Sequence, residues 1–294
     1  MRSISLIGVP LYTLTKNSGI GLGVQTLRNL GIDRALRERC AEFRDCGDIA
    51  LPPLSRDNGP SNNRNSEYFL KCTDVIFDAS NGIREQGLSF YLGGECGLVV
   101  GSAAGLKQQI PGKPGLLWID AHGDFNTPET SPSGFVGGMP LAFVCGRGPR
   151  FSQQIENQQP IIEENAVVHL GGRERDFDPL ESEALRSSRV KVYSPSEFQE
   201  NPNKLAVEIA ETLAKQSDWI ICHLDVDAID PTIMPAVNYP CRNGLTPEDV
   251  KTVVAALSKT GKLRVFNLTA YNSTLDKDGG CGKTILDLVA KLPL

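Results

Sequence analysis

The sequence predicts an α/β fold, a three-layer αβα arrangement in which a parallel sheet of about eight strands lies between two layers of helices. Short apolar or β-branched runs alternate with segments of helical periodicity along the 294 residues. The runs near residues 118 and 221 are almost wholly apolar, as in strands that are covered on both faces. Parallel strands with helical crossovers account for both observations.

The predicted elements follow one another in regular order. Strands are predicted at residues 4–10, 46–51, 88–92, 115–120, 167–171, 190–193, 219–225 and 263–268. Helices are predicted at residues 24–37, 66–86, 97–109, 202–215, 247–259 and 283–292. The Gly- and Pro-rich segment 126–140 is predicted to be a long functional loop. Because no Pro- or Ser-rich linker and no internal repeat interrupts the order, we expect one domain over residues 1–294.

Composition and charge argue against several classes of protein. The net charge is −5 and the lysines and arginines are scattered, which argues against a nucleic-acid partner. The first apolar run is too short for the core of a signal peptide, and no run approaches the ~18 apolar residues of a membrane span. The eight cysteines include no CxxC pair, so we expect thiols in a reducing cytoplasm rather than a disulfide scaffold.

Carboxylates and an imidazole follow two of the predicted strands. One strand is followed by Asp120, His122 and Asp124, and another ends in Asp225 and Asp227. Alternate residues of an extended segment point the same way, so each group can converge on one point. Together they would repel one another without a cation, and their oxygen and nitrogen atoms suit Mn²⁺, with Fe²⁺, Ni²⁺ or Zn²⁺ as alternatives. The competing interpretation is polar residues that merely end two strands.

Two further histidines lie inside apolar strands. His169 and His223 are predicted to be buried core residues rather than ligands.

Five segments carry a more specific resemblance. Residues 118–124 (WIDAHGD) are similar to a DAHxD motif, 224–231 (LDVDAIDP) to DVDxxDP, 93–97 (GGECG) to GGDHS, 244–246 (GLT) to GGLT, and 7–10 (IGVP) to a first strand. These motifs belong to the arginase, agmatinase and formiminoglutamase (ureohydrolase) family, which the chain resembles over nearly its whole length as a divergent member. The resemblance implies an arginase-like, metal-dependent hydrolase of non-peptide C–N bonds.

The resemblance also implies roles for individual residues. Asp120 and Asp225 would bridge two metal ions, and His122 and Asp227 would complete one of them. Asp124 would ligate the other ion, hydrogen-bond the bridging hydroxide that acts as nucleophile, and relay the proton. The family assembles into trimers or hexamers, so a homo-oligomer is expected.

Three positions depart from the family pattern. Cys96 stands where the family has its sixth ligand, a histidine. A thiolate there would shift the preference from Mn²⁺ toward Zn²⁺ or Fe²⁺; in the alternative, Cys96 is only a small buried residue and a single metal position remains. Gly137 aligns with a histidine credited with shuttling protons, and Ala270 with a glutamate that grips a guanidinium. Arginine hydrolysis at normal efficiency is therefore not expected.

Other segments resemble the substrate-binding loops of the family. Asn126, Ser131 and Ser133 resemble a loop that hydrogen-bonds an α-carboxylate, and Glu174 and Asp176 resemble acids that hold an α-amino group. Ordinary turn chemistry is the alternative for these residues. If the resemblance holds, the substrate is amino-acid-like and has an altered side-chain terminus.

Three hypotheses for function follow. The leading one is hydrolysis of an amidine, hydroxyguanidine, guanidine or amide bond in an amino-acid-like small molecule by a metal-bound hydroxide. The second is a catalytically impaired binding or regulatory subunit that keeps the fold, consistent with the changes at Cys96, Gly137 and Ala270. The third is a deacetylase-like amidohydrolase with a single metal ion.

Overall fold

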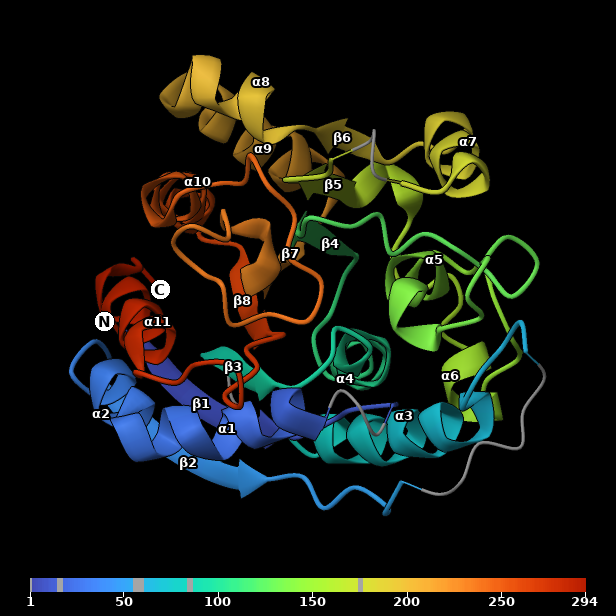
Figure 1. Cartoon of the computed structure of the whole chain (residues 1–294), viewed down its shortest axis with the longest axis horizontal. Helices are drawn as coiled ribbons and strands as arrows, with labels where there is room; N and C mark the ends of the chain where they lie inside the picture. Colours follow the sequence, from blue (N-terminus) through green and yellow to red (C-terminus); the bar gives the residue numbers. More distant parts are fainter. Residues whose placement is uncertain (1, 15–17, 55–60, 84–86, 174–176) are drawn as a thin grey trace.

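An eight-stranded sheet in which every strand is parallel to its neighbours forms the centre of the molecule, as seen in a computed structural model (Figure 1). The structure describes residues 2–14, 18–54, 61–83, 87–173 and 177–294. The strands are β1 (Ser3–Val9), β2 (Glu42–Asp48), β3 (Leu88–Gly93), β4 (Pro114–Ile119), β5 (Val167–Leu170), β6 (Lys191–Tyr193), β7 (Trp219–Asp225) and β8 (Leu263–Thr269). Their order across the sheet is β2-β1-β3-β8-β7-β4-β5-β6. The predicted fold class is confirmed.

Helices cover both faces of this sheet (Figure 1). They are α1 (Ser18–Leu30), α2 (Ile32–Arg37), α3 (Ser66–Asn81), α4 (Leu98–Lys107), α5 (Pro140–Val144), α6 (Gln153–Glu156), α7 (Pro179–Ser187), α8 (Pro195–Glu200), α9 (Pro202–Gln216), α10 (Pro247–Lys259) and α11 (Gly280–Lys291). None of the helices within the described ranges is long and apolar enough to cross a membrane.

Two hydrophobic cores lie between the layers. Side chains of α1, α2, α9, α10 and α11 form one core against one face of the sheet, and those of α3, α4, α5 and α6 form the other. Successive residues of a strand face opposite ways, so Leu117 joins the first core and Trp118 the second. Both faces of the central strands are therefore buried, which explains their unbroken apolar sequences.

Several element boundaries differ from the sequence prediction. The strand predicted at 46–51 lies at Glu42–Asp48, because β2 is an edge strand whose mostly exposed side chains carry no apolar signal. The helix predicted at 24–37 is two helices separated by Gly31, whose φ of 95° lies in the left-handed region. The short helices α5 to α8 were not predicted, because four to nine residues give too little periodicity.

The carboxyl ends of the central strands lie at one edge of the sheet. In the β4–β7 register, Ile119 pairs with Leu224, and in the β7–β8 register Asp225 pairs with Thr269. Since the strands are parallel, the segments that follow β3, β4, β7 and β8 emerge side by side. Ligands of parallel sheets bind at such an edge.

We predict that the amino end of α10 contributes measurably to stability. The Thr246 hydroxyl accepts a hydrogen bond from the Asp249 backbone N–H at 3.1 Å, and the Asp249 carboxylate accepts one from the Thr246 backbone N–H at 2.8 Å. Thr246→Ala should lower the free energy of unfolding by roughly 1 kcal/mol in denaturant titrations. Thr252→Ala, in the exposed middle of the same helix, is the control. Equal losses in the two variants would contradict the prediction.

Candidate metal centre

The two acidic segments meet at the carboxyl edge of the sheet. Asp120 directly follows β4, and Asp225 ends the neighbouring strand β7. The Nδ1 atom of His122 lies 3.5 Å from Asp120 Oδ1 and 3.1 Å from Asp227 Oδ2. The backbone N–H of Ala121 donates to Asp227 Oδ1 at 3.3 Å. Side chains from two separate parts of the sequence thus share one small space.

A turn of the same kind follows Asp120 and Asp225, at the ends of the two strands. The Asp120 carboxylate accepts a hydrogen bond from the backbone N–H of His122 at 2.7 Å. The Asp225 carboxylate accepts one from the backbone N–H of Asp227, also at 2.7 Å. Each aspartate thereby fixes the residue two positions later, as aspartates do in tight turns. The DxH and DxD spacings place their side chains by one shared mechanism.

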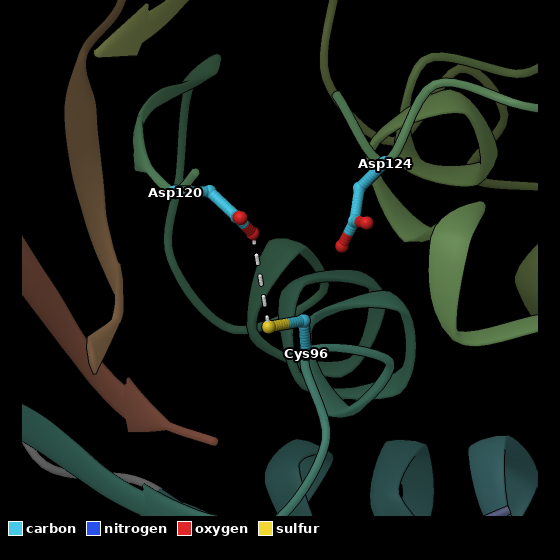
Figure 2. A group of neighbouring side chains, drawn as sticks. All are labelled: Cys96, Asp120 and Asp124. Carbon is cyan, nitrogen blue, oxygen red and sulfur yellow. Dashed lines mark hydrogen bonds between the residues drawn. The ribbon is translucent and has the colours of Figure 1, made fainter. Parts of the chain in front are cut away.

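Asp124 is held in an unusual backbone conformation. Its φ is 47°, in the left-handed region that non-glycine residues seldom adopt. Its carbonyl oxygen accepts hydrogen bonds from the backbone N–H groups of Leu141 and Ala142, at the start of α5. This conformation directs the buried carboxylate toward Asp120 and Cys96 (Figure 2). Strain of this kind is concentrated at functional sites.

Cys96 brings a thiol into the same space from the segment after β3. Its Sγ atom lies 2.9 Å from Asp225 Oδ2 and 4.0 Å from Asp120 Oδ2, the second contact being drawn in Figure 2. The Thr269 hydroxyl, at the end of β8, lies 3.3 Å away. The Cys96 side chain is buried, so it faces the acidic cluster and not solvent.

Burial and mutual repulsion disfavour the charged forms of the carboxylates. Burial and neighbouring acids raise the pKa of Asp124 and Asp225 well above the usual range, and burial raises that of Asp120 to about 6. Burial would also raise the pKa of Asp227, but the adjacent His122 holds it below its usual value. Burial would lower the pKa of His122, yet Asp227 and Asp120 raise it well above the usual range. The single imidazole of His122 cannot neutralise all four carboxylates.

A divalent cation fits this donor set. Ligand atoms of Cys96, Asp120 and Asp124 lie within 4.8 Å of one another, and so do those of Asp120, His122 and Asp227. Asp120 belongs to both groups, so its two oxygens can serve two ions. Carboxylate, imidazole and thiolate ligands together suit first-row transition metals. A cation would also relieve the repulsion that burial imposes on the carboxylates.

A cavity of about 210 Å³ opens above the acidic cluster. Beyond the cluster itself, its lining includes residues from six segments: Ile20, Glu95, Asn126, Phe135, Gly137, Gly138, Glu181, Asn238, Tyr239 and Ala270. This volume holds a small organic molecule in contact with the candidate ligands.

The predicted substrate-binding residues fall into three groups. Asn126 lines the cavity and is buried. Ser131 and Ser133 do not line it: their hydroxyls accept hydrogen bonds from the backbone N–H groups of Gly134 and Phe135 within their own loop. That is the turn chemistry expected as the alternative. Glu174 and Asp176 lie outside the described residues.

Two acidic residues in the cavity wall were not found from the sequence. Glu181 on α7 accepts a hydrogen bond from the Phe125 backbone N–H at 2.9 Å, and burial raises its pKa to about 7. Glu95 accepts hydrogen bonds from the backbone N–H and the hydroxyl of Thr13. The position of Glu95 next to Cys96 was the available signal. Glu181 gave none, because α7 itself was not predicted.

Two of the residues that depart from the family pattern, Gly137 and Ala270, line the cavity. A side chain at Gly137 would overlap the ring of Phe135, which therefore occupies the space of any residue at that position. Ala270 has a φ of 69° and donates its backbone N–H to Gly94 at 2.8 Å. Ala270 lines the cavity with a methyl group, so the wall next to Thr269 is apolar at that point.

The other two histidines lie in the cores, as predicted. His169 and His223 are fully buried, and burial lowers their pKa values to about 4 and about 3. His223 stacks on Trp118 with ring centroids 3.9 Å apart. His169 Nε2 lies 2.6 Å from the backbone oxygen of His122, so it contacts the loop that carries this candidate ligand.

Known proteins resemble this chain in fold and, at lower similarity, in sequence. The model of the arginase family matches residues 2–292. The arginase of Bacillus caldovelox is 29% identical, over 99% of this chain and 98% of its own, and its structure superposes with a TM-score of 0.91. Arginase-1 of Xenopus laevis is 31% identical, over 93% of this chain and 87% of its own. The formimidoylglutamase of Bacillus subtilis has a TM-score of 0.79 at 17% identity, over 100% and 86% of the two chains, a similarity of fold alone.

We predict that the chelated, metal-free protein loses stability as pH rises. Asp120, Asp124 and Asp225 have raised pKa values in the folded state, so folding takes up protons near neutral pH. The stability they contribute is complete below the unfolded pKa and is lost as pH rises through the folded values. The thermal midpoint should fall by a few degrees between about pH 5 and about pH 8.

Asp124→Asn is the matched control for that measurement. Asparagine keeps the shape of the side chain and removes one charge from the cluster, so the fall in the midpoint should be smaller. A midpoint that rises with pH in the metal-free wild type, or an unchanged slope in Asp124→Asn, would contradict the electrostatic account.

Proposed function

This chain belongs to the arginase family. On that premise, we propose that it is a metal-dependent hydrolase of small molecules that resemble amino acids. The bond that it cleaves is an amidine, hydroxyguanidine, guanidine or amide C–N bond. One observation carries the proposal: two groups of metal-binding side chains share Asp120 at the floor of a single cavity. Hydrolysis of C–N bonds is the chemistry of the family. The finer choice of bond and substrate is the proposal. We also propose one domain over residues 1–294.

The candidate ligands have distinct proposed roles. We assign Asp120 and Asp225 as the bridging carboxylates and His122 and Asp227 as ligands of one ion, with Asp124 and Cys96 on the other. Mn²⁺ is the proposed metal, with Fe²⁺, Zn²⁺ or Ni²⁺ as alternatives. When bound, such ions lower the pKa of water and stabilise the negative charge that develops during attack on a C–N carbon.

Asp124 is the proposed proton carrier. Burial and neighbouring acids raise the pKa of its carboxyl group well above the usual range, so it can accept a proton released during attack and pass it to the leaving nitrogen. The hydrogen bonds from Leu141 and Ala142 to its carbonyl oxygen hold the left-handed backbone conformation that places the carboxylate. Gly137 carries no titratable group, and the Phe135 ring fills the adjacent space, so residue 137 supplies no second proton carrier.

The cavity wall supports an amino-acid-like substrate with an unusual terminus. The Asn126 amide and the Glu181 carboxylate offer partners for a carboxylate and an ammonium group. We keep Glu174 and Asp176 as proposed contributors, and Ser131 and Ser133 as residues that shape the carboxylate loop. Ala270 offers only a methyl group where the family pattern has an acid. The reacting end of the substrate is therefore bound without a counter-charge from that position.

A second candidate function rests on the same departures. Cys96, Gly137 and Ala270 replace three polar groups of the family pattern, which is also what a non-catalytic, metal-binding subunit would display. The reducing cytoplasm and the homo-oligomer, a trimer or hexamer, stay predictions of the sequence and of the family resemblance.

Turnover separates the two candidates. Mn²⁺-loaded protein should release urea, hydroxyurea, ammonia or formamide from one member of a panel of guanidino, hydroxyguanidino and formimino amino acids. Asp225→Asn should lower that rate by about two to three orders of magnitude or more, because the substitution removes a charge from both metal positions. Asp287→Asn, on the exposed face of α11, makes the same chemical change away from the cavity and should leave the rate unchanged. A fully metal-loaded protein with no activity on the panel would favour the non-catalytic subunit.

A further inference from the structure

One buried arginine connects the loops of the metal centre. Arg173 follows β5 and is only 4% exposed. Its guanidinium donates to the backbone oxygens of Gly171 at 2.9 Å, Ala228 at 3.1 Å and Cys241 at 3.1 Å. Its own backbone N–H donates to the oxygen of Ala121 at 3.1 Å. A single side chain and its amide therefore join four chain segments.

Three of these segments carry candidate ligands or cavity residues. Ala121 lies between Asp120 and His122, and Ala228 directly follows Asp227. Cys241 belongs to the loop that covers the outer side of His122. The Cys241 Sγ lies 4.0 Å from His122 Nε2, and the Tyr239 ring stands edge-on to the imidazole, with ring centroids 6.1 Å apart.

The chain makes room for this guanidinium. A Cβ atom at residue 244 would overlap Arg173 Nη2 and would also crowd the backbone of Asp230. Gly244 is fixed there because its N–H donates to Asp230 Oδ2 at 3.0 Å. Glycine at 244 thus leaves room for both the guanidinium and the Asp230 backbone, which gives the Gly-Leu-Thr segment a physical role.

Arginine suits this task better than any other side chain. The loops that follow β4, β5 and β7 lie beyond the hydrogen-bonded sheet, and their buried carbonyl groups need donors. The planar guanidinium presents five N–H donors in a fixed geometry and stays charged. One rigid group can hold several carbonyl oxygens at set distances. Metal binding requires such precision, because ligand atoms must be held within about 0.5 Å of their places.

We propose that Arg173 is a positioning residue that holds His122 and Asp227 in the geometry needed for metal binding. Arg173 acts through the backbone of their loops and does not line the cavity above the acidic cluster. The inference rests on the proposed metal-binding role of His122 and Asp227. It also assigns Gly244 a part in metal binding, although Gly244 carries no side chain.

Binding of Mn²⁺ alone, measured by titration calorimetry on chelated protein, tests the proposal. Arg173→Met keeps the length of the side chain and removes its donors, and should raise the dissociation constant roughly ten- to a hundredfold. Arg173→Lys restores a cation that can reach some of the carbonyl oxygens, and should recover part of the loss. Gly244→Ala crowds both the guanidinium and the backbone of Asp230, and should weaken Mn²⁺ binding in the same direction.

Lys262→Met provides the matched control. The Lys262 ammonium also donates to two backbone oxygens, those of Ala214 and Ser217, but it precedes β8 at the opposite edge of the sheet. Its loss should lower the thermal midpoint and leave the Mn²⁺ dissociation constant unchanged.

Each outcome decides the question. Wild-type affinity in folded Arg173→Met, or an equal loss of affinity in Lys262→Met, would overturn the positioning role. If Arg173→Met does not fold, Arg173→Lys gives the answer: wild-type affinity rejects the inference, and binding weakened beyond any change in Lys262→Met supports it. Wild-type protein that binds no Mn²⁺ would instead refute the proposed function from which the inference starts.

Discussion

Mutual repulsion among buried carboxylates is the constraint on which this structure depends. Asp120, Asp124, Asp225 and Asp227 are each at most 7% exposed, and the carboxylates of the first three have raised pKa values because the surroundings disfavour their charges. A single imidazole does not balance them. The parallel sheet creates this arrangement, since the adjacent strands β4 and β7 deliver their final residues to one edge. The donor set fits a divalent cation, and the energetic cost of the cluster explains why one would be needed.

The surroundings of this cluster determine its chemistry as much as the ligands do. Cys96 brings a sulfur atom next to Asp225, into one of the two candidate metal positions; a thiolate ligand there would favour softer metals than Mn²⁺. The Phe135 ring occupies the space that a side chain at residue 137 would need, and Ala270 leaves an apolar surface beside the cluster. All three residues line one cavity, where our proposal places both proton transfer and substrate recognition.

The sequence predicted the parts of the molecule whose signal is local. The bounds of β7 and α10 match the prediction because one is a continuous apolar strand and the other begins at a capping box. The Asp120 and Asp225 segments were found because each has acidic residues at alternate positions, at the end of an apolar strand. Glu181 and Tyr239 were missed because folding brings them to the cavity from loops and a short helix far away in the sequence. Arg173 was missed as a connector because its partners are backbone carbonyls, which have no signature in the sequence.

Quantitative metal analysis of the purified chain tests the central claim most directly. Protein expressed with Mn²⁺ and freed of loosely bound ions should retain at least about one equivalent of transition metal per chain, and about two if the Cys96 position also fills. The Asp120→Asn variant should retain much less, because both candidate positions use this residue. Less than about half an equivalent in the wild type, with any transition metal supplied, would contradict the account. The carboxylates would then be neutralised by protons alone.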